Sequence, residues 1–186
     1  TGISHNHNLS INGGSKKTTY MASLNYNNRE GVIKGTNMYR INFRSLVSSK
    51  VLKDHLDLSA GLNAMYGKHE GVPMNNEGGS VLDAMNYFNP TLPIKNEDGS
   101  WSRGDGSGNY NPLSLIAEDS SEFEWKRMQF IGKATAYIVK GLTWNANYQY
   151  SNKQRTYSSY DSHNTQLNGI SDYNGRANRS TYQGHD

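Results

Sequence analysis

The stretch LTWNANYQYS (residues 142–151) decides the fold, because apolar or aromatic side chains alternate with polar ones along its whole length. A period of two residues is typical of a β-strand whose two faces meet different environments. Similar alternation marks residues 3–12, 19–27, 38–48, 55–66 and, more weakly, 127–139. The pattern slips at Ser45 and Leu46, where we predict a β-bulge. The sequence therefore predicts about six long strands.

The connections between these strands alternate in length. Short ones cover residues 13–18, 48–54 and 140–141, and longer ones cover about 28–37, about 67–126 and the tail from about 152. In an up-and-down antiparallel meander, every short turn falls at one end of the sheet and every long loop at the other. We therefore predict an all-β meander whose three short turns share one end.

The composition excludes several classes of protein. Leu, Ile, Val and Phe together make up only 32 of 186 residues, which is low for a packed soluble domain. The longest unbroken apolar run is residues 136–139, whereas a membrane-spanning helix needs ~20 apolar residues. With no Cys in the chain, disulfides and thiolate metal sites are excluded.

Strand length and aromatic placement favour a transmembrane β-barrel. Strands of ~9–11 residues cross a bilayer, and strands in soluble sheets are usually shorter. Tyrosines lie near strand ends on the apolar face, as in an interfacial girdle: Tyr20, Tyr26, Tyr39, Tyr66 and Tyr150. Because the smallest such barrels have ~8 strands, about six strands would form part of a larger barrel.

A soluble or surface-displayed β-sandwich that binds carbohydrate is the alternative, because a half-buried soluble sheet also alternates. The two folds differ in what covers the apolar face. In a barrel this face meets lipid, and in a sandwich it meets a protein core. The side chains that distinguish the two are Leu56, Leu58, Leu62, Trp144 and Tyr148.

Several short motifs resemble the SusC/RagA family of TonB-linked outer-membrane transporters of Bacteroidetes. In order along the chain they are HNLSINGGSKKTTY (7–20), LNY (24–26), EGVI (30–33), FNPTLP (88–93), NEDG (96–99) and YNPL (110–113). The match covers residues 5–115, and residues 116–186 share only the strand pattern. This resemblance implies the early part of the barrel, with the family's plug domain and TonB box absent from this chain.

The resemblance also implies a function and partners. Such transporters import glycan or peptide fragments across the bacterial outer membrane, and outer-membrane lipid surrounds their barrels. A SusD-like surface lipoprotein covers the barrel as a lid, and the TonB complex supplies energy through parts not in this chain. We expect no cofactor.

Residues 67–126 are predicted to form a long extracellular loop. They hold ten acidic and four basic residues, a negative balance that disfavours anionic ligands. Long loops in compact domains are usually functional, and aromatic rings stack on sugars or peptides. The candidates for contact with substrate or lid are Tyr87, Phe88, Trp101 and Tyr110. Alternatively, these rings pack together in a small satellite core.

Three cations fall on the polar side of the predicted strands: Arg40, Arg44 and Lys133. In a barrel this side lines the lumen, so we predict that these side chains face it. In a sandwich they would point to water.

Other chemistry is not expected. His5 and His7 share a strand face but have no third ligand nearby, and residues 96–100 and 105–109 lack the Glu that completes a calcium loop. Adjacent carboxylates such as Glu97 and Asp98 seldom face each other as acid and base, so we expect no enzyme. The net charge of +3 is too small for nucleic-acid binding.

Overall fold

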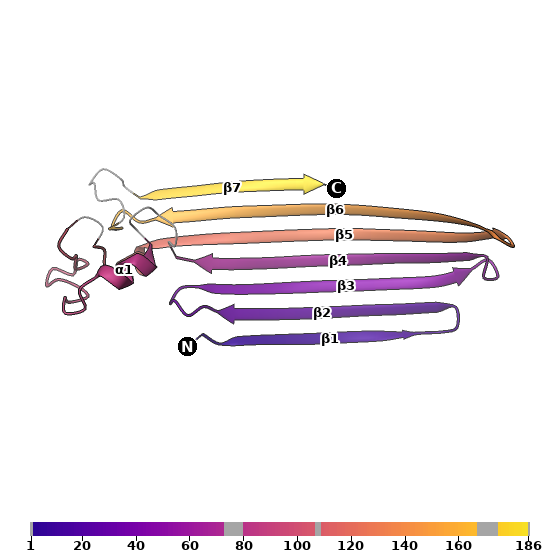
Figure 1. Cartoon of the computed structure of the whole chain (residues 1–186), viewed down its shortest axis with the longest axis horizontal. Helices are drawn as coiled ribbons and strands as arrows, with labels where there is room; N and C mark the ends of the chain where they lie inside the picture. The colour runs from indigo at the N-terminus through magenta and orange to yellow at the C-terminus, as the bar shows by residue number, and fades with distance from the viewer. Residues whose placement is uncertain (1, 73–79, 107–108, 167–174, 186) are drawn as a thin grey trace.

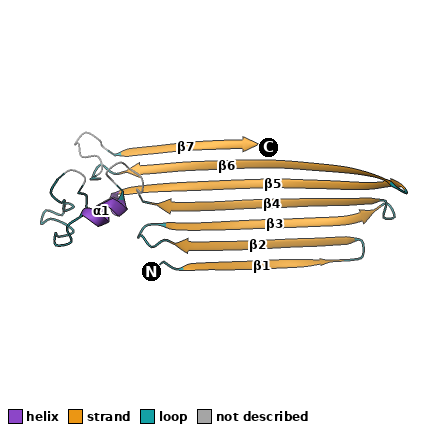
Figure 2. Cartoon of the chain, in the orientation of Figure 1, coloured by secondary structure: helices purple, strands orange, loops and turns teal. Residues whose placement is uncertain are grey.

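The structure is a computed structural model that describes residues 2–72, 80–106, 109–166 and 175–185. In these residues, seven strands form one sheet in chain order, each antiparallel to the next (Figure 1). They are β1 (Ser4–Gly14), β2 (Thr18–Glu30), β3 (Asn37–Val51), β4 (Leu56–Gly71), β5 (Asp119–Val139), β6 (Leu142–Asp161) and β7 (Arg176–His185). Two short helices, α1 (Val81–Tyr87) and α2 (Pro112–Glu118), lie in the connection between β4 and β5 (Figure 2).

This arrangement confirms the predicted all-β antiparallel meander. The turns after β1, β3 and β5 share one end of the sheet, on the right in Figure 1, and the longer connections share the other. The described strands number seven rather than about six, because β6 continues to Asp161 and pairs there with β7. Both faces of this pair are mostly polar, so the contrast that marks a half-apolar strand is missing from the sequence.

The connection between β4 and β5 is shorter than predicted. It covers residues 72–118 instead of about 67–126, and we call it the long connection. The strands that flank it keep pairing to the Gly71–Ser121 pair, beyond the expected strand ends. In that zone, the β5 side chains on the face of the apolar band are charged, as with Glu122 and Glu124. The sequence there therefore lacks the apolar residues that mark the rest of the strand.

The predicted bulge at Ser45 and Leu46 was wrong. Both residues pair in unbroken register with β2 and β4. Leu46 lies on the polar face and packs over Gly61, where an added Cβ would lie 3.3 Å from the Leu46 Cδ1 atom. An apolar residue at this position therefore fits without a bulge. The register shift in the sheet lies instead between Tyr137 and Val139, beside the turn that leads to β6.

One face of the sheet carries an apolar band. Two cross-strand rows at its centre consist of Leu9, Leu24, Phe43, Ala64 and Met128, and of Ile11, Ala22, Ser45, Leu62 and Phe130. Leu9 is 73% exposed and Met128 is 50% exposed. Leu58, Trp144 and Tyr148, on the same face, are exposed as well. In the described part of the chain, no second layer covers this band.

The buried apolar residues lie at the loop end of the sheet. Val72, Val81, Ala84 and Leu115, all in the long connection, form a small satellite core, and Ile33, Tyr110 and Ile116 pack against it. Both helices that carry it are capped, since Ser80 Oγ accepts from the Asp83 N–H and Asn111 Oδ1 accepts from the Leu113 N–H, each at 3.0 Å. None of the helices described here is long and apolar enough to span a membrane.

Candidate functional site

Amide side chains line the polar face, the side of the sheet opposite the apolar band. Asn25 Nδ2 donates to Asn6 Oδ1 at 2.8 Å, and Asn42 Nδ2 donates to Asn25 Oδ1 at 3.4 Å. Farther across the sheet, Asn63 Nδ2 donates to Gln129 Oε1 at 3.3 Å. Each amide both donates and accepts, so this lining can bind water or the hydroxyl groups of a ligand.

The three predicted lumen-facing cations all lie on the polar face. The register places Arg40 beside Gly67, Arg44 beside Asn63, and Lys133 beside Ser59. All three cations are exposed. Arg40 and Arg44 lie nearer the loop end, and Lys133 lies nearer the short turns. The structure thus confirms that they share one face, and the lumen itself stays a prediction.

The polar face also carries Trp125, a tryptophan with arginines on the neighbouring positions of the sheet. Trp125 of β5 lies directly opposite Arg155 of β6, and Arg127 follows it two residues later on the same side of β5. On its other side, Trp125 pairs with Gly67, which in turn pairs with Arg40 of β3. We call Arg40, Trp125, Arg127 and Arg155 the arginine–tryptophan cluster.

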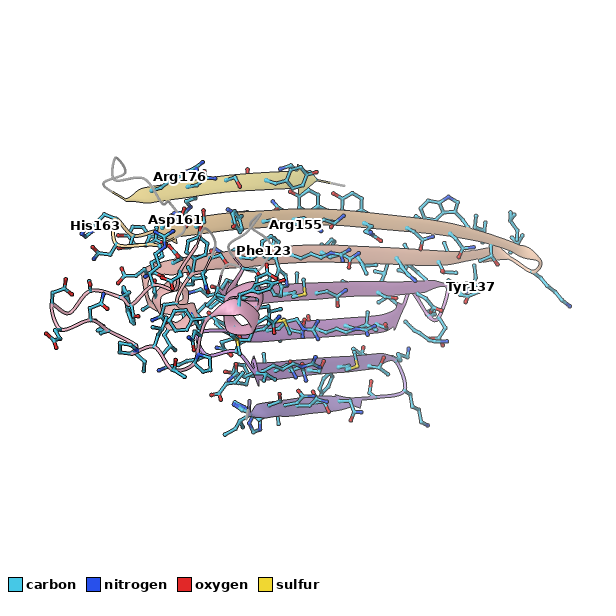
Figure 3. All side chains as sticks on the ribbon, turned by 60° about the vertical axis from the view of Figure 1, so that its left-hand side comes forward. Phe123, Tyr137, Arg155, Asp161, His163 and Arg176 are labelled. Atoms are coloured by element: carbon cyan, nitrogen blue, oxygen red, sulfur yellow. The ribbon has the colours of Figure 1, made fainter. Side chains whose placement is uncertain are left out.

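Phe123 extends this cluster toward the loops. Its ring centroid lies 5.6 Å from that of Trp125, with the two rings tilted by 36°. Phe123 and Arg155 lie toward the end of the sheet that carries the long connection (Figure 3). The sequence analysis placed Phe123 and Trp125 in a loop and Arg155 in the tail. Phe123, Trp125 and Arg127 follow one another at intervals of two residues, which is the strand period that could have indicated their shared face.

Gly67 makes room for the Trp125 indole. A Cβ added at position 67 would overlap atoms Cε2, Cζ2 and Nε1 of the Trp125 ring. The ring therefore lies over β4 at a position that has no side chain, an arrangement in which an aromatic residue covers a strand glycine. This packing holds the indole over Gly67.

We expect Gly67→Ala to displace the indole and loosen β5 around it. Overpacking of this kind costs ~1–3 kcal/mol, so amide exchange of residues 121–129 should accelerate about tenfold. Hydrogen–deuterium exchange with mass spectrometry measures this rate. Gly132→Ala is the control, because a Cβ there meets its nearest atom, Phe130 Cε1, at an ordinary 3.7 Å. Equal exchange in the two variants would contradict the packing described.

Trp101 lies in the long connection and lines a small polar pocket. Its indole N–H donates to Glu118 Oε1 at 2.9 Å, and Lys95 Nζ lies 4.5 Å from the ring centroid. The indole N–H also lowers the pKa of the Glu118 carboxyl below its usual range. The pocket is lined by Lys95, Asp98, Gly99, Ser100, Trp101, Glu118, Asn164 and Gln166.

The other three predicted aromatic candidates occupy different surroundings. Tyr110 packs against the satellite core, with Arg103 over its ring at 5.3 Å. Phe88 is half-buried at the end of α1, and Tyr87 is 72% exposed. The structure thus does not bring the four rings together in one site. Their contact with a ligand or a lid protein stays a prediction.

Comparison with known proteins points to one family. No protein-family model matches the chain. TonB-dependent receptor P26 of Formosa agariphila is 32% identical over 121 residues, which are 63% of this chain. TonB-dependent receptor SusC of Bacteroides thetaiotaomicron is 30% identical over 53% of this chain, and receptor P3 of Formosa agariphila is 28% identical over 82%. These similarities support the TonB-dependent receptor family.

The chain spans only a small part of these receptors. It covers 12% of the length of P26, 10% of SusC and 16% of P3. The activity, substrates and partners of a whole receptor therefore enter below as proposals.

Asp119 is a buried carboxyl group where the long connection enters β5. Its Oδ2 atom accepts from the Thr165 hydroxyl at 2.6 Å, and its Oδ1 atom has no partner in the described residues. Burial, together with the nearby charges of Asp161 and Glu118, raises its pKa from 3.8 to about 6. The folded chain therefore holds this proton more tightly than the unfolded chain.

We expect the packing around Asp119 to weaken as the pH rises. The stabilisation is fully present below the unfolded pKa of 3.8 and is lost as the pH rises through about 6. Amide exchange of residues 112–119 and 162–165, corrected for intrinsic rates, should show more opening at pH 7.5 than at pH 4. Asp119→Asn should remove most of this dependence. An unchanged dependence in that variant would show that another group titrates.

The remaining polar motifs are satisfied locally. Asp98 Oδ1 accepts from the Ser100 N–H at 2.9 Å and from the Ser100 hydroxyl at 2.6 Å, which closes the turn at 96–100. The His5 and His7 rings lie 5.4 Å apart, and His7 stacks on Tyr26. Residues 107 and 108, within the 105–109 motif, lie outside the described residues. Across the described residues, no three His, Asp or Glu side chains group as metal ligands.

Proposed function

We propose that this chain is a segment of the barrel of a SusC/RagA-type TonB-dependent transporter in the bacterial outer membrane. The transporter imports glycan or peptide fragments. The observation that carries the proposal is the contrast between the two faces of one long-stranded meander. One face bears an uncovered apolar band, and the other bears amides and cations. The comparisons with TonB-dependent receptors agree with this proposal.

The height of the apolar band supports a membrane environment. On β4 the band runs from Leu56 to Tyr66, which spans ~33 Å along the strand at ~3.3 Å per residue. With the usual strand tilt this corresponds to ~25 Å across the membrane, the height of the apolar belt on outer-membrane barrels. Tyr39 and Tyr66, whose rings lie 5.9 Å apart, mark the border of the band.

Charged residues follow on the same face directly beyond these tyrosines. Lys68 Nζ lies 2.9 Å from Glu70 Oε1 and 2.8 Å from Glu122 Oε2. These carboxylates raise the pKa of Lys68 above its usual range. A network of ionised groups is costly in hydrocarbon, so we place it above the lipid tails, on the rim of the barrel.

The orientation of the segment follows from its turns. Outer-membrane barrels keep short turns in the periplasm and long loops outside the cell. We infer that the turns after β1, β3 and β5 are periplasmic and that the long connection is extracellular. There Trp101 and its pocket can reach the imported ligand or a SusD-like lid. The TonB complex acts through other parts of the transporter.

Transport by the intact protein tests this proposal. Cells that carry the full-length gene should take up labelled oligosaccharides or peptides, and loss of the gene or of TonB should reduce uptake to background. The two ligand classes are supplied separately, so the result also identifies the cargo. Uptake that persists without the gene, with the protein absent from outer-membrane fractions, would contradict the proposal.

A further inference from the structure

We propose that the arginine–tryptophan cluster binds a negatively charged sugar, so that the imported glycan carries carboxylate or sulfate groups. This inference rests on the proposed transport function and names its substrate class. It is carried by the distribution of charge on the polar face, by the packing of Trp125 and by the arrangement of the arginines around it.

Charge is segregated between the two faces of the sheet. From the row of Lys133 to the row of Phe123, the described polar face carries cations and no Asp or Glu. The cations are Arg29, Arg40, Arg44, Arg127, Lys133, Lys153 and Arg155. Glu70, Glu122 and Glu124 lie at a similar height, but on the opposite face. Between these rows, a ligand on the described polar face therefore meets cations and neutral polar groups but no carboxylate.

This separation changes the conclusion drawn from the acidic balance of residues 67–126. That balance counted Glu70, Glu122 and Glu124, which lie on the face of the sheet opposite the polar face. Other carboxylates of the segment are engaged locally. Asp83 accepts from the Ser80 hydroxyl at 2.7 Å, Asp98 accepts from Ser100, and Glu118 accepts from Trp101. The acidic balance of the segment is thus not presented to a ligand on the polar face between the rows of Lys133 and Phe123.

The cluster arginines are available for a ligand. Arg40, Arg127 and Arg155 are exposed, and within the described chain none of them forms a salt bridge. A guanidinium group binds carboxylate or sulfate through two parallel N–H bonds, a geometry that the lysine ammonium cannot provide. Exposed arginines that form no salt bridge, on a face lined by amide side chains, therefore provide an anion-binding surface.

The position of Trp125 favours a sugar over other anions. Its ring lies over Gly67, and flat aromatic faces stack on the C–H faces of sugar rings. Residues directly opposite on neighbouring strands lie ~5 Å apart, so Arg155 is the cross-strand neighbour of Trp125, and Arg127 follows along β5. On the other side, Arg40 pairs with Gly67, the residue that the indole covers. A sugar stacked on the indole would place charged substituents at its edge beside these guanidinium groups.

The surrounding amides suit the rest of a glycan chain. Asn42 and Asn63 lie on the same face beside Arg40 and Arg44, and Gln129 lies two residues beyond Arg127. Their amides can exchange the long hydrogen bonds they now make, at 3.3 to 3.4 Å, for bonds to sugar hydroxyls. The site thus combines stacking, anion binding and hydroxyl binding in one surface.

The test uses the purified full-length transporter and four probes of similar length. They are an oligogalacturonate, a sulfated oligogalactan, a neutral oligogalactan and a glutamate-rich peptide. We expect the wild-type protein to bind at least one of the two anionic sugars more tightly than the neutral one. Arg127→Gln with Arg155→Gln should weaken that binding at least tenfold and leave neutral binding unchanged. The separate anionic arms distinguish carboxylate from sulfate.

The matched control is Lys126→Gln. Lys126 lies between Trp125 and Arg127 in the sequence but faces the other side of the sheet, where its Nζ is 4.0 Å from Glu124 Oε2. The same loss of charge there should leave affinity within twofold of wild type. If the double variant fails to insert, Arg155→Lys replaces it, since it keeps the charge but loses the bidentate geometry. This variant should bind severalfold more weakly.

The remaining outcomes each contradict a defined claim. Equal binding of neutral and anionic sugars, or equal losses for both in the arginine variant, would overturn the anionic site and leave transport standing. Tighter binding of the acidic peptide would overturn the sugar assignment. A protein that binds none of the probes and supports no TonB-dependent uptake would contradict both this inference and the proposed function.

Discussion

Leu62→Arg is expected to abolish stable insertion of the full-length protein into the outer membrane. Leu62 lies in the centre of the apolar band, between Ser45 and Phe130. An arginine at the bilayer midplane of a barrel costs ~2–4 kcal/mol, enough to deplete the inserted form at least tenfold. Outer-membrane fractionation and heat-modifiable migration in gels measure insertion.

Asn63→Arg provides the control for this substitution. It is the next residue of β4, but it faces the polar side beside Arg44 and Gln129. A cation there enters a surface that is already positive and hydrated, so insertion should stay near the wild-type level. If both variants inserted equally well, the apolar band would not meet lipid.

Leu115→Ala is expected to unfold the long connection without disturbing the sheet. Leu115 is fully buried and belongs to the satellite core, whose other buried members are Val72, Val81 and Ala84. Replacing a buried Leu by Ala costs ~2–5 kcal/mol, and a core of this size has few other contacts to offset that loss. Limited proteolysis of intact cells should cleave the variant within residues 80–118 much faster than wild type.

Leu113→Ala separates burial from helix propensity in this test. Leu113 also lies in α2, but it is 38% exposed and outside the satellite core. Its cleavage rate should stay close to that of wild type. Equal acceleration in both variants would show that the burial of Leu115 does not hold the connection, and rapid cleavage of wild type would show that the satellite core does not hold it.

The sequence allowed the fold class, the strand order and the end of the short turns to be predicted, because these follow from local periods and connector lengths. Alternation fails where both faces of a strand are polar. For this reason residues 152–161 and 176–185 were read as a tail, although they pair as β6 and β7. Pairing between strands, which no local pattern records, identifies them.

The candidate site was predictable only in part. Arg40 and Arg44 could be assigned to the polar face because their strand alternates clearly. Trp125 was missed because Phe123 and Trp125 lie on the face of β5 opposite Met128 and Phe130, so the apolar alternation changes phase within the strand. The relation between Trp125 and Gly67 depends on a register between two strands that the long connection separates. Only the three-dimensional structure shows this contact.

The central claim is that the two faces of the sheet meet different media, lipid on one and water on the other. Spin labels on single cysteines at positions 58–65 of β4, in the full-length protein in native-like membranes, test it most directly. We predict that oxygen accessibility peaks at 58, 60, 62 and 64, and that accessibility to a water-soluble nickel complex peaks at 59, 61, 63 and 65. Labels at 58, 60, 62 and 64 that are shielded from both reagents would place this face in a protein core and contradict the account.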